Sequence, residues 1–309
     1  NRFEVTALSA RSEQTREKAR KQFPDATIHP DYRALIRSDA VEAVVILTPI
    51  PMNAPVGMEV LEAGKHAVME KPMATSLAEA EKLIETEQKS KGTIYLLEQF
   101  PHKSSIPAAK ELLHEGILGD VLHFEYVAHN RLTEAAEGES PSWGDTRWRQ
   151  ETTFPLGNIF DGGIHNLSLL QMLFGIPRAV LSVGSNVRPT YGEYDTISSL
   201  LTYDGSLIGT FCHSGYLPGV QNYLILRGSR GAAQIGDRSV TIRLADGSEE
   251  ERRIEYENES VRMWREIASA IGKGARTTYS SGESLNDLKV LAAIEASLKE
   301  ARRVEVGSK

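Results

Sequence analysis

The stretch AVVILTP at residues 43–49 indicates the fold, because five apolar residues in a row end abruptly at Thr48-Pro49. A short apolar run between polar residues is typical of a parallel strand that is buried on both faces. Working outward, further short strands are predicted at residues 3–9, 26–28, 66–69 and 94–97. Residues at helical spacing lie between them, at 13–23, 31–36, 54–63 and 76–91. Strands that alternate with helices predict a parallel sheet with right-handed crossovers.

The second half of the chain has a different pattern. A helix is predicted at residues 107–115 and a strand at 121–129, and short runs rich in Val, Ile, Thr and Tyr follow between 179 and 242. Tight turns such as Asp204-Gly205 separate these runs, which predicts an open, mostly antiparallel sheet. Helices are expected at 261–271 and 284–301. We therefore predict an α/β domain at residues 1–100 and an α+β domain at 101–309.

Composition limits the classes of function. A chain of 309 residues can form two hydrophobic cores, and a formal charge of -7 argues against a nucleic-acid partner. No apolar stretch reaches the roughly 18 residues of a membrane span. Cys212 is the single cysteine, so neither a disulfide framework nor a four-cysteine zinc site is expected. Because we also see no signal peptide, we expect a cytoplasmic protein.

Lys71 is the first candidate for chemistry. Ligands of parallel sheets bind outside the carboxyl ends of the strands, and Ser9, Thr48, Lys71 and Glu98 all occupy such positions. In Glu70-Lys71-Pro72, a partly desolvated lysine can hold a substrate hydroxyl and relay its proton. The alternative is a solvated lysine in an ordinary turn.

Asp161-Gly162-Gly163-Ile164-His165 is the second candidate. If one helix begins near Asp161, the spacing of four places the carboxylate and the imidazole on one face, where Asp161 orients His165 as a general acid or base. The alternative is a helix cap and an ordinary core histidine. Zinc binding by this pair is disfavoured because no further His or Cys lies at ligand spacing, so we expect no metal. A nucleophilic triad is poorly supported, since no Gly-x-Ser-x-Gly turn occurs.

The end of the first strand bears on the cofactor. A dinucleotide fold usually has an acidic residue there for the adenosine ribose, whereas this chain has Ser9, Arg11 and Ser12. Hydroxyls and a guanidinium suit a 2′-phosphate, which favours NADP over NAD, with NAD still possible. The alternative is a simple helix-capping turn.

Taken together, the motifs resemble the Gfo/Idh/MocA family, the glucose-fructose oxidoreductase and inositol dehydrogenase group. The resemblance spans nearly the whole chain. It rests on residues 43–49, Ala63-Gly64-Lys65-His66, Glu70-Lys71-Pro72, Gly116-Ile117-Leu118-Gly119, Trp148-Arg149 and residues 161–165, which follow in the order of the family.

The resemblance implies a Rossmann domain, a substrate domain that commonly forms oligomer contacts, and hydride transfer between nicotinamide and a sugar or cyclitol carbon. Lys71 is similar to the lysine that bridges nicotinamide ribose and substrate, His165 to the acid/base, and Asp161 to the carboxylate that supports both. Other positions resemble the surroundings of the cofactor: Thr48, Pro49, Glu70, Glu98, Gln99, Trp148 and Arg149. A small-molecule substrate and a homodimer or homotetramer are expected.

Two departures from the family pattern matter. Asn53 stands where the family usually has a histidine, and we assign it no catalytic role. The first strand and its Gly-x-Gly-x-x-Gly turn are also absent from the sequence, a unit of roughly 30 residues that cradles the pyrophosphate. We expect the complete protein to contain this unit.

Three functions remain open at this point. The leading one is an NAD(P)-dependent dehydrogenase or reductase. The others are a regulatory protein that senses a sugar or nucleotide and a glycoside hydrolase that recycles its cofactor. The combination of Lys71, Asp161 and His165 favours the dehydrogenase.

Overall fold

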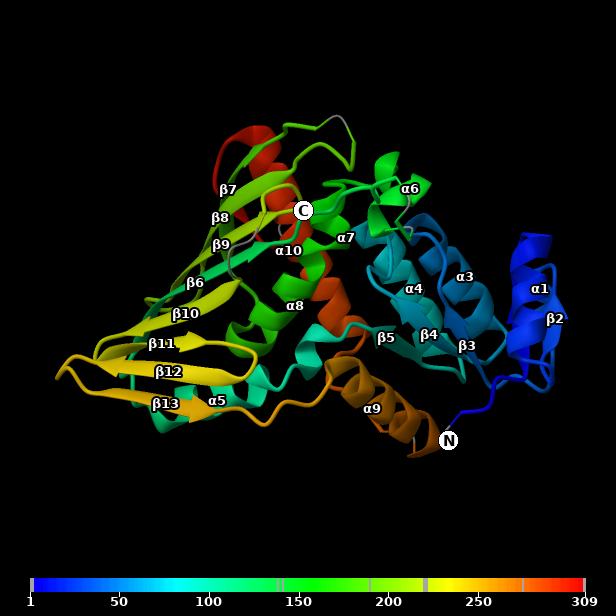
Figure 1. Ribbon diagram of the computed structural model, residues 1–309, viewed down its shortest axis with the longest axis horizontal. Helices are drawn as coiled ribbons and strands as arrows, with labels where there is room; N and C mark the ends of the chain where they lie inside the picture. The colour runs from blue at the N-terminus through cyan, green and yellow to red at the C-terminus, as the bar shows by residue number, and fades with distance from the viewer. Residues whose placement is uncertain are drawn as a thin grey trace.

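The computed structural model describes residues 3–137, 139–140, 142–188, 190–218, 222–273 and 275–307. Its N-terminal part contains the predicted parallel strands (Figure 1). These are β1 (Ala7–Ser9), β2 (Thr27–His29), β3 (Ala43–Ile46), β4 (His66–Glu70) and β5 (Ile94–Leu97). The intervening helices are α1 (Glu13–Gln22), α2 (Tyr32–Ile36), α3 (Ile50–Glu62) and α4 (Leu77–Lys89). The predicted alternation of parallel strands and helices is therefore confirmed.

Helix α3 begins at Ile50, four residues earlier than the sequence suggests. Pro49 is its N-cap and Pro51 lies in its first turn. Backbone N–H groups of the first turn have no partner within a helix, so a proline there costs little. The prolines thus mark the start of this helix and do not delay it.

The parallel strands form two separate sheets. Strand β1 pairs with β2, and β3 pairs with β4, which pairs with β5. A Rossmann sheet places its first strand between the second and the fourth, and no strand among the described residues bridges this position. Val45 and Leu47, on and just after β3, are 45% and 69% exposed. Figure 1 shows α1 and β2 standing apart from β3.

The described residues of the second part form a nine-stranded sheet in the order β13-β12-β11-β10-β6-β9-β8-β7-β14. Its strands are β6 (Val121–His129), β7 (Ala179–Ser185), β8 (Thr196–Thr202), β9 (Ile208–Ser214), β10 (Tyr223–Gly228), β11 (Gly231–Ile235), β12 (Ser239–Leu244), β13 (Glu249–Arg253) and β14 (Val304–Glu305). Only β6 and β9 pair in parallel within this described sheet. The predicted open, mostly antiparallel sheet is therefore confirmed.

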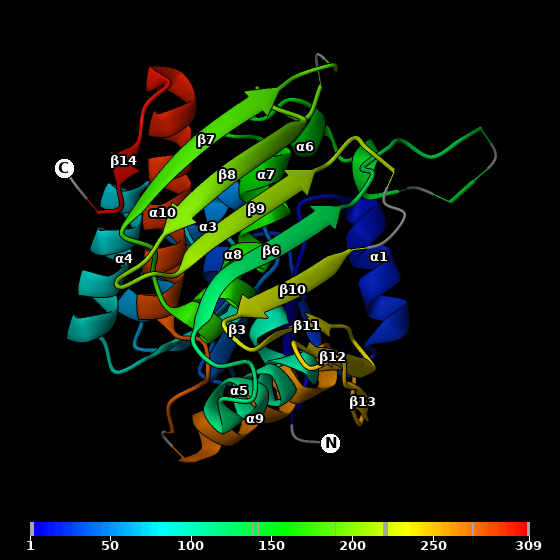
Figure 2. The ribbon, with the colours of Figure 1, turned by 90° about the vertical axis from the view of Figure 1, so that its left-hand side faces the viewer.

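Helices cover one face of this sheet (Figure 1). They are α5 (Ser105–Glu115), α8 (Gly163–Phe174) and α10 (Ser281–Glu300). Figure 2 shows the opposite, open face, where four large apolar side chains are more than one third exposed. They are Leu181, Val183, Leu200 and Ile208.

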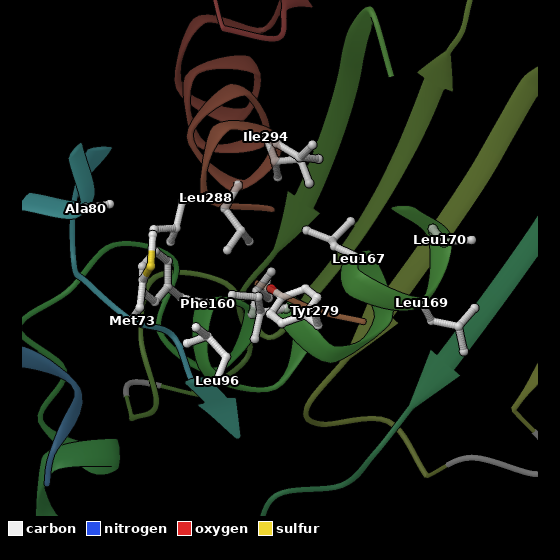
Figure 3. Packing of buried hydrophobic residues seen from close by; sticks show 14 of the residues in the cluster. Met73, Ala80, Leu96, Phe160, Leu167, Leu169, Leu170, Tyr279, Leu288 and Ile294 are labelled. Carbon is white, nitrogen blue, oxygen red and sulfur yellow. The ribbon is translucent and has the colours of Figure 1, made fainter. Parts of the chain in front are cut away.

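The two parts share one hydrophobic core. Met73 and Leu96 of the N-terminal part pack in the same cluster as Phe160, Leu167 and Leu288 (Figure 3). A second, smaller cluster holds helix α9 (Glu259–Lys273) against β4 and β5 through Met263, Ile267 and Ala270. Burial of apolar side chains between the parts holds the strand ends of the N-terminal sheets in place beside α8.

Candidate active site

A cleft of about 890 Å³ lies between the carboxyl ends of the N-terminal strands and the helix-covered side of the large sheet. From the first side it is lined by Leu47, Thr48, Pro49, Ile50, Glu70, Lys71, Gln99 and Phe100. Residues of the second part that line it include Trp148, Arg149, Asn158, Asp161, Gly162, His165 and His213. Each apolar run is followed here by a polar residue or a proline, so the strand ends. The side chains that follow the strand can then face a ligand.

Lys71 bridges the two parts of the chain. Its Nζ atom donates to the backbone oxygen and to Oδ1 of Asp161, both at 2.7 Å. The lysine side chain is 10% exposed, and the peptide bond to Pro72 is cis. The alternative of a solvated lysine in a turn is therefore wrong.

Asp161 accepts hydrogen bonds from two cations. Its second oxygen, Oδ2, lies 2.7 Å from Nε of Arg149. Burial alone would raise the pKa of Asp161, but the neighbouring charges of Lys71 and Arg149 hold that pKa below its ordinary value. The carboxylate is thus ionised, and both of its oxygens are engaged.

His165 pairs with a carboxylate that lies far away in the sequence. Its Nδ1 atom is 2.8 Å from both carboxylate oxygens of Glu98, and the ring stacks on Phe100 at a centroid distance of 4.9 Å. The expected pairing of Asp161 with His165 on one helix is wrong. Helix α7 (Asn158–Asp161) ends at Asp161, and α8 begins only after Gly162. Gly162 between them still has right-handed helical dihedral angles, so the pairing fails because other groups engage the two side chains.

Glu98 is fully buried at the end of β5. Burial by itself would raise its pKa, yet the facing His165 and the N–H of Phe100 hold the pKa below its ordinary value. The sequence placed Glu98 at a strand end near the cofactor and did not connect it to His165. The apolar run before Glu98 indicated that this residue stands at a strand end. Its contact with His165 depends on tertiary packing.

The remaining predicted site residues fall into two groups. Thr48, Pro49, Glu70, Gln99, Trp148 and Arg149 line the cleft. Within it, the Arg149 guanidinium lies 4.0 Å from the ring centre of Trp148, and burial raises the pKa of Glu70. Ser9, Arg11 and Ser12 lie outside the cleft, at the end of β1. Ser12 accepts from the N–H of Thr15 as the N-cap of α1, whereas Arg11 is exposed.

Asn158 and His213 are among the cleft residues that the sequence analysis missed. Asn158 belongs to α7, and His213 lies on β9 beside Phe211. His213 is 1% exposed, and its Nδ1 atom lies 3.1 Å from the side-chain amide of Asn166. Alternation along β9 would have placed His213 on the covered face with Phe211, but not in the cleft.

The residues of the cleft fit a nicotinamide nucleoside. Leu47 and Trp148 offer apolar and aromatic surface, and Lys71 offers a cation at a strand end for hydroxyl oxygens. Asn53 has a structural role, because its amide donates to the backbone oxygens of Glu70 and Pro72. In the part of the chain that the structure describes, no group of three or more His, Cys, Asp or Glu residues could hold a metal. Nor does any described helix combine the length and the apolarity needed to cross a bilayer.

Comparison with known proteins agrees with this architecture. Residues 1–97 match the oxidoreductase family with an NAD-binding Rossmann fold, and residues 106–234 match the C-terminal domain of the same family. The scyllo-inositol 2-dehydrogenase (NADP(+)) of Bacillus subtilis is 24% identical over 93% of this chain and 85% of its own length. The trans-1,2-dihydrobenzene-1,2-diol dehydrogenase of mouse is 31% identical over 75% of this chain, and the alignment spans 66% of the mouse protein.

A solved structure has the same fold over nearly the whole chain. The oxidoreductase of Thermotoga maritima superposes with a TM-score of 0.88 at 25% identity, covering 98% of this chain and 90% of its own. The resemblance seen in the sequence is thereby confirmed, as is the predicted fold class.

Proposed function

The chain belongs to the Gfo/Idh/MocA family of oxidoreductases, and on that premise we propose that it transfers hydride between NADP and an alcohol carbon of a sugar, cyclitol or related polyol. The observation that carries this proposal is the convergence of Lys71 and His165, from different parts of the chain, on one cleft. The nicotinamide ring, when bound, supplies the hydride acceptor or donor. The names of the Bacillus and mouse relatives, both dehydrogenases of hydroxylated rings, support the substrate class.

Lys71 and His165 have complementary roles in this proposal. Oxidation of an alcohol removes a hydride from carbon and a proton from oxygen. His165 accepts that proton and returns it in the reverse direction, and the ammonium of Lys71 donates a hydrogen bond to the same oxygen. Asp161 holds Lys71 in place and stays ionised, because Arg149 neutralises its other oxygen.

The end of β1 supports NADP as the cofactor. Arg11 is exposed there and has no ion pair with another described residue, so its guanidinium is available to a 2′-phosphate. Ser9 and the N-terminus of α1 at Ser12 lie beside it. The Bacillus relative is named for NADP(+), and NAD is the alternative cofactor.

The open face of the large sheet supports a homo-oligomer, either a dimer or a tetramer. Leu181, Val183, Leu200 and Ile208 expose apolar surface on neighbouring strands, and such surface usually marks a contact with another protein. Light scattering coupled to gel filtration tests this, with Val183→Glu as the variant expected to weaken the association. The free, partly buried Cys212 is compatible with the cytoplasmic location that belongs to the same proposal.

The deciding experiment titrates the complete protein with NADPH and NADH, then screens polyols and keto sugars for a change in nicotinamide absorbance. We expect tighter binding of NADPH and turnover of at least one cyclic polyol. Binding without turnover of any compound would favour the regulatory alternative. Cleavage of a glycoside with no net absorbance change would favour the hydrolase.

A further inference from the structure

Asp161 makes no hydrogen bond with the His165 ring in the described structure. Its Oδ1 accepts from Lys71 and its Oδ2 from Arg149, each at 2.7 Å. Both carboxylate oxygens are thus committed to cations. The imidazole faces a second carboxylate, Glu98, which no part of the proposed function uses.

The contact between Glu98 and His165 determines where the imidazole proton lies. Glu98 is ionised, because the facing imidazole and a backbone N–H outweigh the effect of burial on its pKa. An ionised carboxylate only accepts hydrogen bonds, so the Nδ1 atom of His165, 2.8 Å away, must donate. In the neutral ring, Nε2 is then the unprotonated nitrogen, and it has no partner among the described residues.

The plane of the imidazole is held as well. Phe100 stacks on His165 with an angle of 24° between the rings. The ring of Phe100 also lies against Lys103, whose Nζ is 4.4 Å from the ring centre. The N–H of Phe100 donates to Oε1 of Glu98 at 3.0 Å, so one short segment fixes both the partner and the plane of the imidazole.

We propose that Glu98 is the positioning residue of His165: it accepts the Nδ1 proton, which leaves Nε2 as the atom that exchanges a proton with the substrate oxygen. This inference rests on the proposed function for the identity of the substrate oxygen. It assigns to Glu98 the orienting role that the sequence alone suggested for Asp161.

Glu98→Gln gives the sharpest test because it removes the charge and replaces one of the two acceptors of Nδ1 by a donor. The amide oxygen is needed by the N–H of Phe100, and the amide nitrogen at the other position can only donate. Nδ1 can then accept, which shifts the ring towards the tautomer with the proton on Nε2. We expect kcat to fall by roughly 10²- to 10⁴-fold, with the KM for NADPH unchanged, and Glu98→Asp to recover part of the loss.

The tautomer is read directly from long-range ¹H–¹⁵N spectra of the histidines in alkaline buffer, where the rings are neutral. A His165→Gln spectrum assigns the signals. We expect Nδ1–H in the wild type and a larger share of Nε2–H in Glu98→Gln. Glu266→Gln is the matched control, because Glu266 faces Nδ1 of His102 at 3.3 Å outside the cleft. It should change the His102 signals and leave His165 and turnover unchanged.

A wild-type spectrum with the proton on Nε2 would overturn the inference, even if no variant folds. So would a Glu98→Gln protein that retains the wild-type rate. A different result would refute the proposed reaction: a wild-type protein that oxidises no polyol. A tautomer switch in that same protein would still support the positioning role of Glu98.

Discussion

The Nζ atom of Lys71 lies 2.7 Å from two oxygens of a single residue, the carboxylate Oδ1 and the backbone carbonyl of Asp161. The bond joins the end of a strand in the nucleotide-binding part to the end of a short helix in the second part, 90 residues later. Both side chains are at most 10% exposed. The ammonium is buried and donates two hydrogen bonds to Asp161, so its position is fixed. It can therefore direct a further hydrogen bond to one substrate oxygen.

Removal of either reacting group should abolish most of the activity. Lys71→Ala and His165→Ala are each expected to lower kcat by roughly 10²- to 10⁴-fold, because each loses a group that stabilises or moves charge on the substrate oxygen. Turnover measures the effect, and circular dichroism checks the fold. Lys110→Ala and His114→Ala, two exposed positions on α5, serve as controls. Near-wild-type rates in both cleft variants would eliminate the proposed site.

Arg149→Leu should lower the stability at neutral pH and flatten its dependence on acid. The folded-state pKa of Asp161 is depressed, so its contribution to stability is present above the ordinary carboxyl pKa and is lost as the pH falls. Without Arg149 the depression is smaller, so this contribution is smaller at neutral pH and less of it is lost in acid. Urea unfolding at a series of pH values measures this. Arg147→Leu is the matched control, since Arg147 forms only a surface pair with Glu151. Identical pH profiles of the two variants would refute the role of Arg149.

Arg11→Ala should change cofactor preference without affecting the cleft. A hydrogen bond to a charged group contributes about 1.5–3 kcal/mol, so the KM for NADPH should rise by roughly 10- to 100-fold while that for NADH stays constant. Steady-state kinetics with both cofactors give the ratio. Arg20→Ala removes an exposed arginine of α1 that pairs with Glu13, and it should leave the ratio unchanged. An equal effect of Arg11→Ala on both cofactors would contradict the preference for NADP.

His213→Gln should flatten the dependence of stability on acid pH. Burial, with the nearby charges of His129 and His165, lowers the pKa of His213 to about 4. The unfolded chain binds this proton more readily, so stability falls as the pH drops from about 6.5 towards 4. A pKa reduction of this size corresponds to about 3 kcal/mol, and the glutamine variant lacks that loss. Denaturant unfolding from pH 7 to about 4 tests this, with the partly exposed His123→Gln as control. Parallel stability curves for wild type and His213→Gln would show that His213 has the same pKa in the folded and unfolded chain, which would refute the depression.

The local sequence pattern was sufficient to predict the N-terminal strands and most helices. Apolar runs bounded by polar residues predicted β3, β4 and β5 within one or two residues, because burial on both faces requires apolar residues at successive positions. The start of α3 was predicted four residues too late, although the first turn of a helix accepts the prolines near Ile50.

The sequence by itself determined which side chains stand at strand ends and which segments alternate, and from these it identified Lys71, Asp161 and His165 as candidates. Only the tertiary structure decided their partners. Asp161 is four residues from His165, yet it binds Lys71, whereas His165 binds Glu98, 67 residues before it. Local periodicity describes which side chains share a face of one helix, but not which groups of distant segments face them. The pairing of charges across the cleft then depends on how the buried apolar surfaces bring the two parts of the chain together.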